Sequence, residues 1–118
     1  MGAAKDELGR AGEEMAAGYL VGEGMEILAR NWRCREGEID IVARDGAVLV
    51  VVEVRTRSSG AYGSAFASVT EAKLARLRRL GARWLAGQFQ WFASVRIDVV
   101  ALDGFAGTFS IRHEKGVF

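Results

Sequence analysis

The sequence predicts an α/β sandwich with a central mixed sheet, in the order helix, three strands, helix and one or two strands. Two segments show the three-to-four-residue spacing of apolar side chains that is typical of helices, and short apolar runs typical of strands lie between and after them. An Asp-Gly pair between two of these runs favours a tight hairpin. Elements in this order favour helices packed against a shared sheet.

The N-terminal segment has the features of a helix. Asp6 is suited to cap it, and we expect it to end near Val21, because glycines follow there. Residues 27–32 then predict the first strand. The helix carries an apolar stripe that we expect to face the sheet, formed by Leu8, Ala11, Met15 and Tyr19.

The hairpin is expected to have arms over residues 38–43 and 48–55. Its second arm is apolar at consecutive positions, as expected of a central strand covered on both faces. A loop with an even number of residues sets Ala43 opposite Val48, and places Asp40 and Glu53 on one face. The two acids are then diagonal neighbours with backbones roughly 7 to 8 Å apart.

The C-terminal half predicts a helix and one or two further strands. Thr70 is suited to cap a helix that runs to about Leu85. Residues 95–102 predict a strand, and residues 109–112 a short last one. At 118 residues the chain has the length of one domain, so we expect residues 1–118 to form a single unit.

Composition bounds the cellular setting. The formal net charge of +1 does not indicate a polyanionic partner. A case for nucleic-acid binding must therefore rest on local clusters of basic residues. Cys34 is the only cysteine, which favours a reducing compartment. No apolar stretch is long enough to cross a bilayer, and we expect a cytoplasmic protein without a membrane partner. The sequence has no phosphate-binding P-loop, and Ser-His or Cys-His catalysis has little support.

Asp40 and Glu53 are the leading candidates for chemistry. Carboxylates inside a sheet are costly unless a positive charge compensates them. Mg²⁺ needs only one or two carboxylates beside an open face, and such an ion can activate water for attack on a phosphodiester. Arg55 points the same way as Glu53, since side chains alternate along a strand. The alternative is that the two acids merely pair with nearby arginines: Arg33, Arg35 or Arg55.

The first helix offers a third acid. On an idealised wheel, Glu14 falls opposite the apolar stripe, whereas Glu13 sits at its edge and can reach inward. Glu13 is therefore a candidate to bind the metal directly or through water, and a solvated glutamate is the alternative.

Basic residues offer candidate contacts to nucleic acid. Arg76, Arg79 and Arg83 form a ridge on the second helix that suits a phosphate backbone, although such ridges also serve solubility. Tyr62 lies in a Gly/Ser-rich loop, where it can stack on a base or be an ordinary surface tyrosine. The expected contacts to nucleic acid are Arg57, Lys73, Arg76 and Tyr62, with Gln88 as a weaker candidate for substrate contact.

Linked motifs over nearly the whole chain resemble the bacterial YraN family. They are Gly12-Glu13-x-x-Ala16-x-x-Tyr19-Leu20, Asn31-Trp32-Arg33-Cys34-Arg35, Gly37-Glu38-Ile39-Asp40, Leu49-Val50-Val51-Val52-Glu53-Val54-Arg55-Thr56-Arg57 and Arg96-Ile97-Asp98-Val99-Val100. That family is similar to the restriction-endonuclease-like superfamily and, within it, to archaeal Holliday-junction resolvases. The resemblance implies a restriction-endonuclease-like α/β/α sandwich, in which Asp40, Glu53 and Glu13 match the acidic signature positions.

Residue 55 departs from the superfamily pattern, which usually has lysine there. Arginine does not deprotonate in proteins and presents a planar fork in place of a point charge. Arg55 is therefore able to stabilise phosphate charge and unable to act as a general base, so activation of the water would rest on the metal.

The leading hypothesis is an Mg²⁺- or Mn²⁺-dependent endonuclease that hydrolyses phosphodiester bonds of DNA, including branched or damaged DNA. Asp40, Glu53 and Glu13 would be metal ligands, and Arg55 would complete the catalytic set. DNA is expected in preference to RNA, and a homodimer would make paired cuts easiest. The alternatives are a non-catalytic nucleic-acid-binding protein that retains a nuclease-like fold, and a protein-interaction module of this fold.

Overall fold

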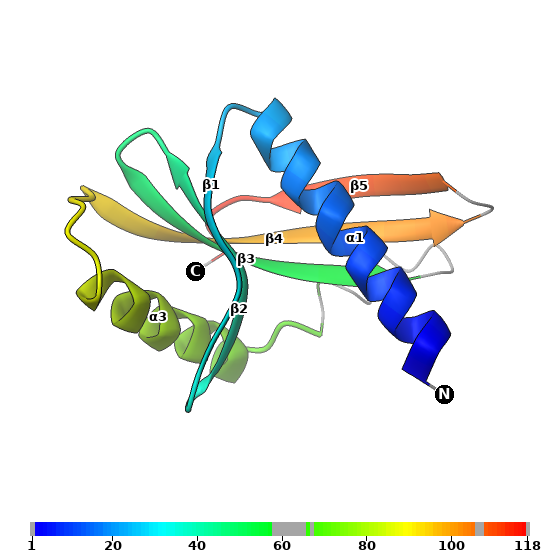
Figure 1. Ribbon diagram of the computed structural model, residues 1–118, viewed down its shortest axis with the longest axis horizontal. Helices are drawn as coiled ribbons and strands as arrows, with labels where there is room; N and C mark the ends of the chain where they lie inside the picture. Colours follow the sequence, from blue (N-terminus) through cyan, green and yellow to red (C-terminus); the bar gives the residue numbers. More distant parts are fainter. Residues whose placement is uncertain (1, 58–65, 67, 106–107, 118) are drawn as a thin grey trace.

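The computed structural model describes residues 2–57, 66, 68–105 and 108–117 (Figure 1). The chain begins with α1 (Gly2–Gly22) and continues through β1 (Glu26–Cys34), β2 (Gly37–Asp45) and β3 (Val48–Arg57). It ends with α3 (Glu71–Ala86), β4 (Ser94–Phe105) and β5 (Thr108–Glu114). The predicted element order and the α/β fold are confirmed, and Thr70 caps α3 as expected, accepting a hydrogen bond from the Lys73 N–H.

The five strands form one mixed sheet in the order β1-β2-β3-β4-β5. Neighbouring strands are antiparallel except for β3 and β4, which are parallel and therefore need a crossover connection. The crossover contains α3, which packs on one face of the sheet, while α1 packs on the other (Figure 1). Neither of these described helices is long and apolar enough to cross a membrane.

Each helix covers its own buried cluster. Side chains alternate between the two faces along β3, so successive residues enter different clusters. Burial on both faces explains the run of apolar residues predicted for a central strand. The α1-side core consists of Ala16, Ala17, Leu20, Met25, Ile41, Ala43, Val50, Val52, Val100 and Leu102. The α3-side core consists of Ile39, Val42, Leu49, Val51, Leu74, Leu77, Leu80, Trp84 and Ile97.

The predicted apolar stripe of the first helix was wrong in its orientation. Met15, assigned to the buried face, is 44% exposed, whereas Ala16 and Leu20 are fully buried. The helix approaches the sheet through its smaller residues, because these allow the closest contact with the strands. That rotation also turns Gly12 directly onto β3.

Gly12 marks the closest approach of α1 to the sheet. A Cβ atom at this position would lie 2.2 Å from Oγ1 of Thr56 on β3, and 3.0 Å from its Cγ2. No contact of that length is tolerated, so a larger residue would require the Thr56 side chain or the helix to shift. The neighbouring residue, Glu13, is thereby held close to the strands.

A buried polar network fastens the C-terminal strand to this scaffold. Asp98 is fully buried, and its carboxylate bonds Arg96, the ring Nε2 of His113 at 2.8 Å and the N–H of Gly116. The other ring nitrogen of His113 lies 3.1 Å from the hydroxyl of Tyr19 on α1. The network therefore also fixes the C-terminal part of α1.

Replacement of Gly12 by alanine should lower the free energy of unfolding by up to about 2 kcal/mol. Alanine normally stabilises a helix by about 1 kcal/mol relative to glycine, but overpacking against Thr56 costs about 1–3 kcal/mol. Gly18→Ala is the matched control, because Gly18 lies in the same helix with no atom within 4 Å of an added Cβ. Urea denaturation should show a loss for the first variant and a gain for the second; a gain for both would contradict the close contact.

Candidate active site

The sheet divides between β2 and β3. Their ladder of paired residues ends at Ile41 and Val52, beyond which β2 continues only beside β1, and β3 continues beside β4. Figure 1 shows the β1–β2 pair curving away from β3 and β4. We call this divergence, just beyond the pair Ile41–Val52, the fork. Asp40 and Glu53 are the first residues past it on their respective strands.

The register of the hairpin differs from the predicted one by two residues. Ala43 lies opposite Val50, where Val48 was expected, and Asp45 pairs with Val48. The turn therefore consists of Gly46 and Ala47, with Gly46 in the left-handed region at a φ of 61°. A shift of two residues preserves the face of each side chain, so the two acids remain neighbours. They are no longer diagonal neighbours, because each directly follows a member of the last pair, Ile41–Val52.

Side-chain alternation breaks in β1 and β2 beside the fork. Ile39 packs in the α3-side core and Ile41 in the α1-side core, although positions two apart in a regular strand share a face. On β1, Asn31 has a φ of 51°, a left-handed conformation that asparagine tolerates better than most residues. The break lets β1 and β2 bend away from β3, and it lies at Asp40.

Asp40 takes over the role of a missing strand partner. Its Oδ2 accepts a hydrogen bond of 2.8 Å from the backbone N–H of Val54, which β2 no longer satisfies with a carbonyl. Burial and, after it, the negative charge of Glu53 raise the pKa of Asp40 to about 7, and the hydrogen bond from the Val54 N–H acts in the opposite direction. The site therefore holds more negative charge than its environment readily accommodates.

Glu53 lies almost fully buried between two cations. The residue is 5% exposed, and its Oε2 is 3.0 Å from Nη2 of Arg55 and 3.6 Å from Nζ of Lys73. The alternative that an acid pairs with a nearby arginine is thus seen for Glu53 and Arg55. Lys73, which is also a predicted contact to nucleic acid, reaches Glu53 from the first turn of α3.

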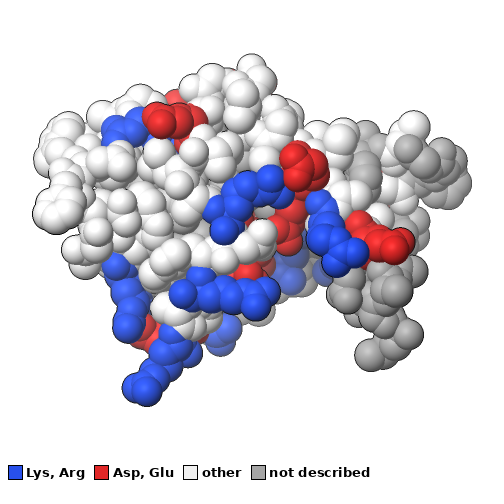
Figure 2. Space-filling model, viewed as in Figure 1, with Lys and Arg blue, Asp and Glu red and all other residues white. Residues whose placement is uncertain are grey.

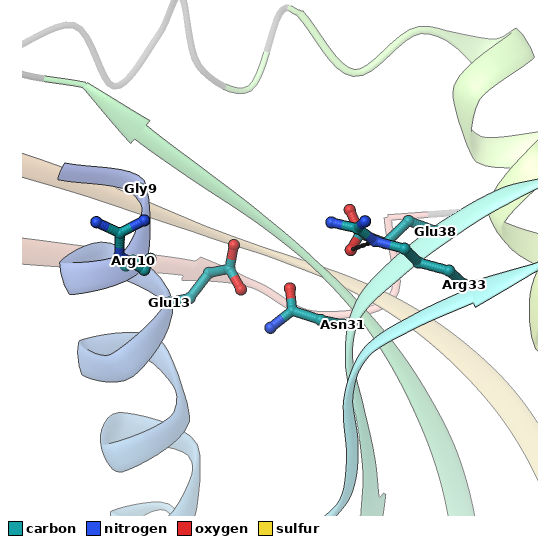
Figure 3. Close-up of a pocket in the computed structure, with 6 residues that line it drawn as sticks. All are labelled: Gly9, Arg10, Glu13, Asn31, Arg33 and Glu38. Atoms are coloured by element: carbon teal, nitrogen blue, oxygen red, sulfur yellow. Dashed lines mark hydrogen bonds and ion pairs between the residues drawn. The ribbon is translucent and has the colours of Figure 1, made fainter. Parts of the chain in front are cut away.

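Glu13 lines an open pocket on the α1 side of the fork. Figure 3 shows it extending from α1 toward Asn31 on β1. Burial raises the pKa of Glu13, the side-chain amide of Asn31 opposes that effect, and the charge of Glu38 adds to it. The pocket has a volume of about 520 Å³ and is lined by Gly9, Arg10, Glu13, Asn31, Arg33 and Glu38.

The structure brings Asp40 and Glu53 together and leaves Glu13 to one side. Within the described ranges, no three acidic, histidine or cysteine side chains are grouped closely enough to hold one metal ion. A direct metal contact from Glu13 therefore stays a prediction. Glu14, which was expected to point away, does so and pairs with Arg30 at 3.1 Å.

The remaining predicted residues lie around this centre or outside the described chain. Arg57 donates from Nη1 to the carbonyl of Thr56. Arg76 is exposed and has no ion pair within the part of the chain that the structure describes, and Gln88 is half-buried after the end of α3. Tyr62 lies outside the described residues.

Sequence reasoning missed Asn31 and Glu38 as pocket residues. Both lie within motifs that support the YraN resemblance, but neither residue type has a distinctive chemical signal by itself. The left-handed conformation of Asn31 depends on the bend at the fork, which a regular strand pattern does not reveal.

The sequence profile described as "Uncharacterised protein family UPF0102" matches residues 12–102 of the chain. A UPF0102 protein of Arthrobacter sp. (strain FB24) is 56% identical over 115 residues, covering 97% of this chain and 98% of the relative. The chain belongs to UPF0102. This is the family that the sequence motifs identified under the name YraN.

Further UPF0102 relatives match over nearly their whole length. The protein of Beutenbergia cavernae is 55% identical over 115 residues, covering 97% of this chain and 98% of the relative. The protein of Mycolicibacterium vanbaalenii is 47% identical over 112 residues, covering 94% and 93%. The matched span of this UPF0102 chain includes Glu13, Asp40 and Glu53. These names describe a family and no activity, so the function must be argued from the site.

The proton on Asp40 gives a direct test of the charge at the fork. Because the pKa of Asp40 is raised to about 7 in the folded chain, the folded state binds this proton more tightly than the unfolded chain. The stability that it contributes is therefore present at low pH and declines between about pH 4 and pH 7.

Glu53→Gln should lower the pKa of Asp40, since it removes the second-largest cause of the shift. Carboxyl ¹³C chemical shifts followed by NMR titration measure it, and Asp40→Asn should abolish the corresponding decline in unfolding free energy. Glu14→Gln is the control with an exposed acid and should leave the titration unchanged. An ordinary pKa for Asp40 in the wild type would show that the acids are not coupled.

Proposed function

We propose that this UPF0102 protein is a divalent-metal-dependent endonuclease that hydrolyses phosphodiester bonds of DNA. The observation that carries the proposal is the meeting of Asp40 and Glu53 at the fork, with Arg55 and Lys73 beside them. Two acids beside two cations provide a place for a metal and for the phosphate that the metal would polarise.

The carboxylates fit a hard cation such as Mg²⁺ or Mn²⁺. Their contacts within the described residues use Oδ2 of Asp40 and Oε2 of Glu53, which leaves Oδ1 and Oε1 for other ligands. Mg²⁺ prefers oxygen ligands and binds through one or two carboxylates while it keeps several waters. Bound there, it would supply Lewis-acid polarisation and activation of water. Glu13 would contribute through a water, since it lies in the adjoining pocket.

The arginine and the lysine fit the phosphate. Nε of Arg55 is buried with no hydrogen-bond partner within the described chain, and an unsatisfied buried donor costs about 1–3 kcal/mol. A phosphate oxygen would satisfy that donor. Lys73 places a compact ammonium near Glu53. In the superfamily pattern this ammonium would come from a lysine at residue 55. The ammonium of Lys73 can stabilise charge on the attacked phosphate.

Purified protein should nick DNA in Mn²⁺ and lose that activity in EDTA. Asp40→Asn and Glu53→Gln should each reduce the cleavage rate by at least about 100-fold, the scale expected for loss of an electrostatic catalytic group. Branched, single-stranded and duplex DNA serve as substrates, and gel electrophoresis measures the products. Glu13→Gln should cause a loss that Glu14→Gln does not, since these adjacent acids face different sides of α1.

Equal nicking by wild type and both acid variants would identify a contaminating nuclease and remove the catalytic proposal. Metal binding has a separate readout, because Mn²⁺ is paramagnetic. It should broaden the NMR signals of residues at the fork in the wild type and leave them sharp in Asp40→Asn.

Lys73 should matter more than the arginine that follows it on the same side of α3. Lys73→Ala should slow cleavage by about 10- to 100-fold, because it removes positive charge next to the reacting phosphate. Arg76→Ala should weaken DNA binding with little effect on the rate at saturation, since Arg76 has no contact with either acid in the described residues. Rates at saturating and at low DNA concentration separate the two effects; identical behaviour of both variants would contradict a place for Lys73 in the site.

One observation favours a second candidate function, a non-catalytic DNA-binding protein. Glu53 already has two cationic partners, so the fork is electrostatically compensated in part without a metal. Binding that weakens with salt, without cleavage and unchanged in Asp40→Asn, would support it. Under either function we propose a cytoplasmic location, where the DNA lies, and a homodimer as the form able to make paired cuts.

A further inference from the structure

Two largely exposed aromatic side chains lie in the connection between α3 and β4. Phe89 is 108% exposed and Trp91 is 74% exposed, and the only other large exposed hydrophobic residues among those described are Met15, Val21 and Val95. A surface tryptophan and phenylalanine two positions apart expose a large apolar area to water.

The connection is held in place by contacts from its other residues. Arg44 on β2 donates to Oε1 of Gln90 at 2.5 Å and stacks on the ring of Phe92 at 4.2 Å. The backbone N–H of Ala93 bonds the carbonyl of Ala47 at 2.7 Å. Anchored residues therefore alternate with Phe89 and Trp91. The two exposed rings sit on a fixed support, and little conformational entropy would be lost if they bound a partner.

A basic path links these rings to the fork. On an idealised wheel, Lys73, Arg76, Arg79 and Arg83 lie on the same side of α3. Arg83 pairs with Glu36, whereas Arg76 and Arg79 are exposed without an ion-pair partner in the described part of the chain. Figure 2 shows basic side chains along the lower edge of the view, around α3 and the β1–β2 hairpin, and an uncharged left end where α3 joins β4. The 16-residue helix spans about 24 Å between the two regions.

We propose that Phe89 and Trp91 stack on unpaired bases, and that Arg76 and Arg79 carry the attached phosphate backbone toward the fork. Aromatic rings next to a positively charged track are the arrangement that binds single strands without sequence preference. Base pairs in a duplex hide the faces that such rings need. The inference deepens the proposed function and rests on it: the DNA substrate has a single-stranded segment of several nucleotides next to the bond that is cut.

The charge along α3 favours a nucleic acid over a protein partner. A second copy that docked symmetrically through this face would bring its own arginines against Arg76 and Arg79, whereas a phosphodiester backbone complements both. The apolar area is also concentrated in two rings, which suits stacking on separate bases.

Fluorescence titration in EDTA tests the proposal, because binding is then measured without cleavage. Trp84 is buried and Trp32 partly buried, so an oligothymidylate of about twelve nucleotides should quench mainly the emission of Trp91. Phe89→Ala combined with Trp91→Ala should raise the Kd for this oligonucleotide by about tenfold or more, measured by fluorescence anisotropy of a labelled strand. The Kd for a duplex of the same length should change by less than about twofold.

The control variants separate stacking from loss of the fold. Trp91→Phe should keep the affinity and lose the quenching, and Met15→Ala, which removes another exposed apolar residue, on α1, should change neither. Equal affinity of the wild type for single strand and duplex would overturn the inference, as would a Trp91 signal that does not respond to DNA. Sedimentation showing a dimer that the double alanine variant dissociates would assign the rings to self-association and overturn it too.

The outcomes also distinguish this inference from the catalytic proposal. Quenching and single-strand preference without metal-dependent nicking would leave the stacking surface in place and remove the endonuclease. Nicking that is equal on single-stranded and duplex DNA, and unaffected by the double alanine variant, would keep the endonuclease and remove the stacking surface.

Discussion

The hydrogen bond from the Val54 N–H to Asp40 is the contact on which the site depends. A backbone donor inside a sheet must find an acceptor, and β2 turns away before it can offer a carbonyl to Val54. The carboxylate of Asp40 supplies that acceptor. One residue therefore closes the sheet at the fork and brings a negative charge next to Glu53. Asp40 therefore has both a structural and an electrostatic role. Asparagine at this position would keep an acceptor for the Val54 N–H and would remove the charge.

The charges at the fork come from elements that approach from both faces of the sheet. Glu13 arrives on α1, held close by Gly12, and Lys73 arrives on α3, while Arg55 extends from β3 itself. Asp40 and Glu53 thus lie at the fork between β2 and β3, an opening in the sheet between the two helices. An opening between strands gives a ligand access to residues that a continuous sheet would bury. The pKa of Asp40 is raised there by its burial and by the charge of Glu53.

Much of the fold could be predicted because its signals are local. The apolar runs, the Thr70 cap and the Asp-Gly turn indicated the order of elements, and the parity of the turn placed Asp40 near Glu53 even though the register was two residues off. The bend at Asn31 could not be predicted, since no local pattern announces the left-handed Asn31 or the entry of Ile39 into the α3-side core. The rotation of α1 was missed for a related reason: hydrophobicity favoured Met15, whereas the close approach of two backbones favoured Gly12.

The parallel pairing of β3 with β4 has a consequence for how the site is assembled. The β2–β3 hairpin is local and can form within microseconds, but the parallel pair must wait for the whole crossover that contains α3. During folding, Asp40 and Glu53 therefore meet before Lys73 arrives to offset their repulsion. Protonation of either acid would ease that first encounter, so the earliest step in building the sheet is favoured by the same proton that the finished site holds so tightly.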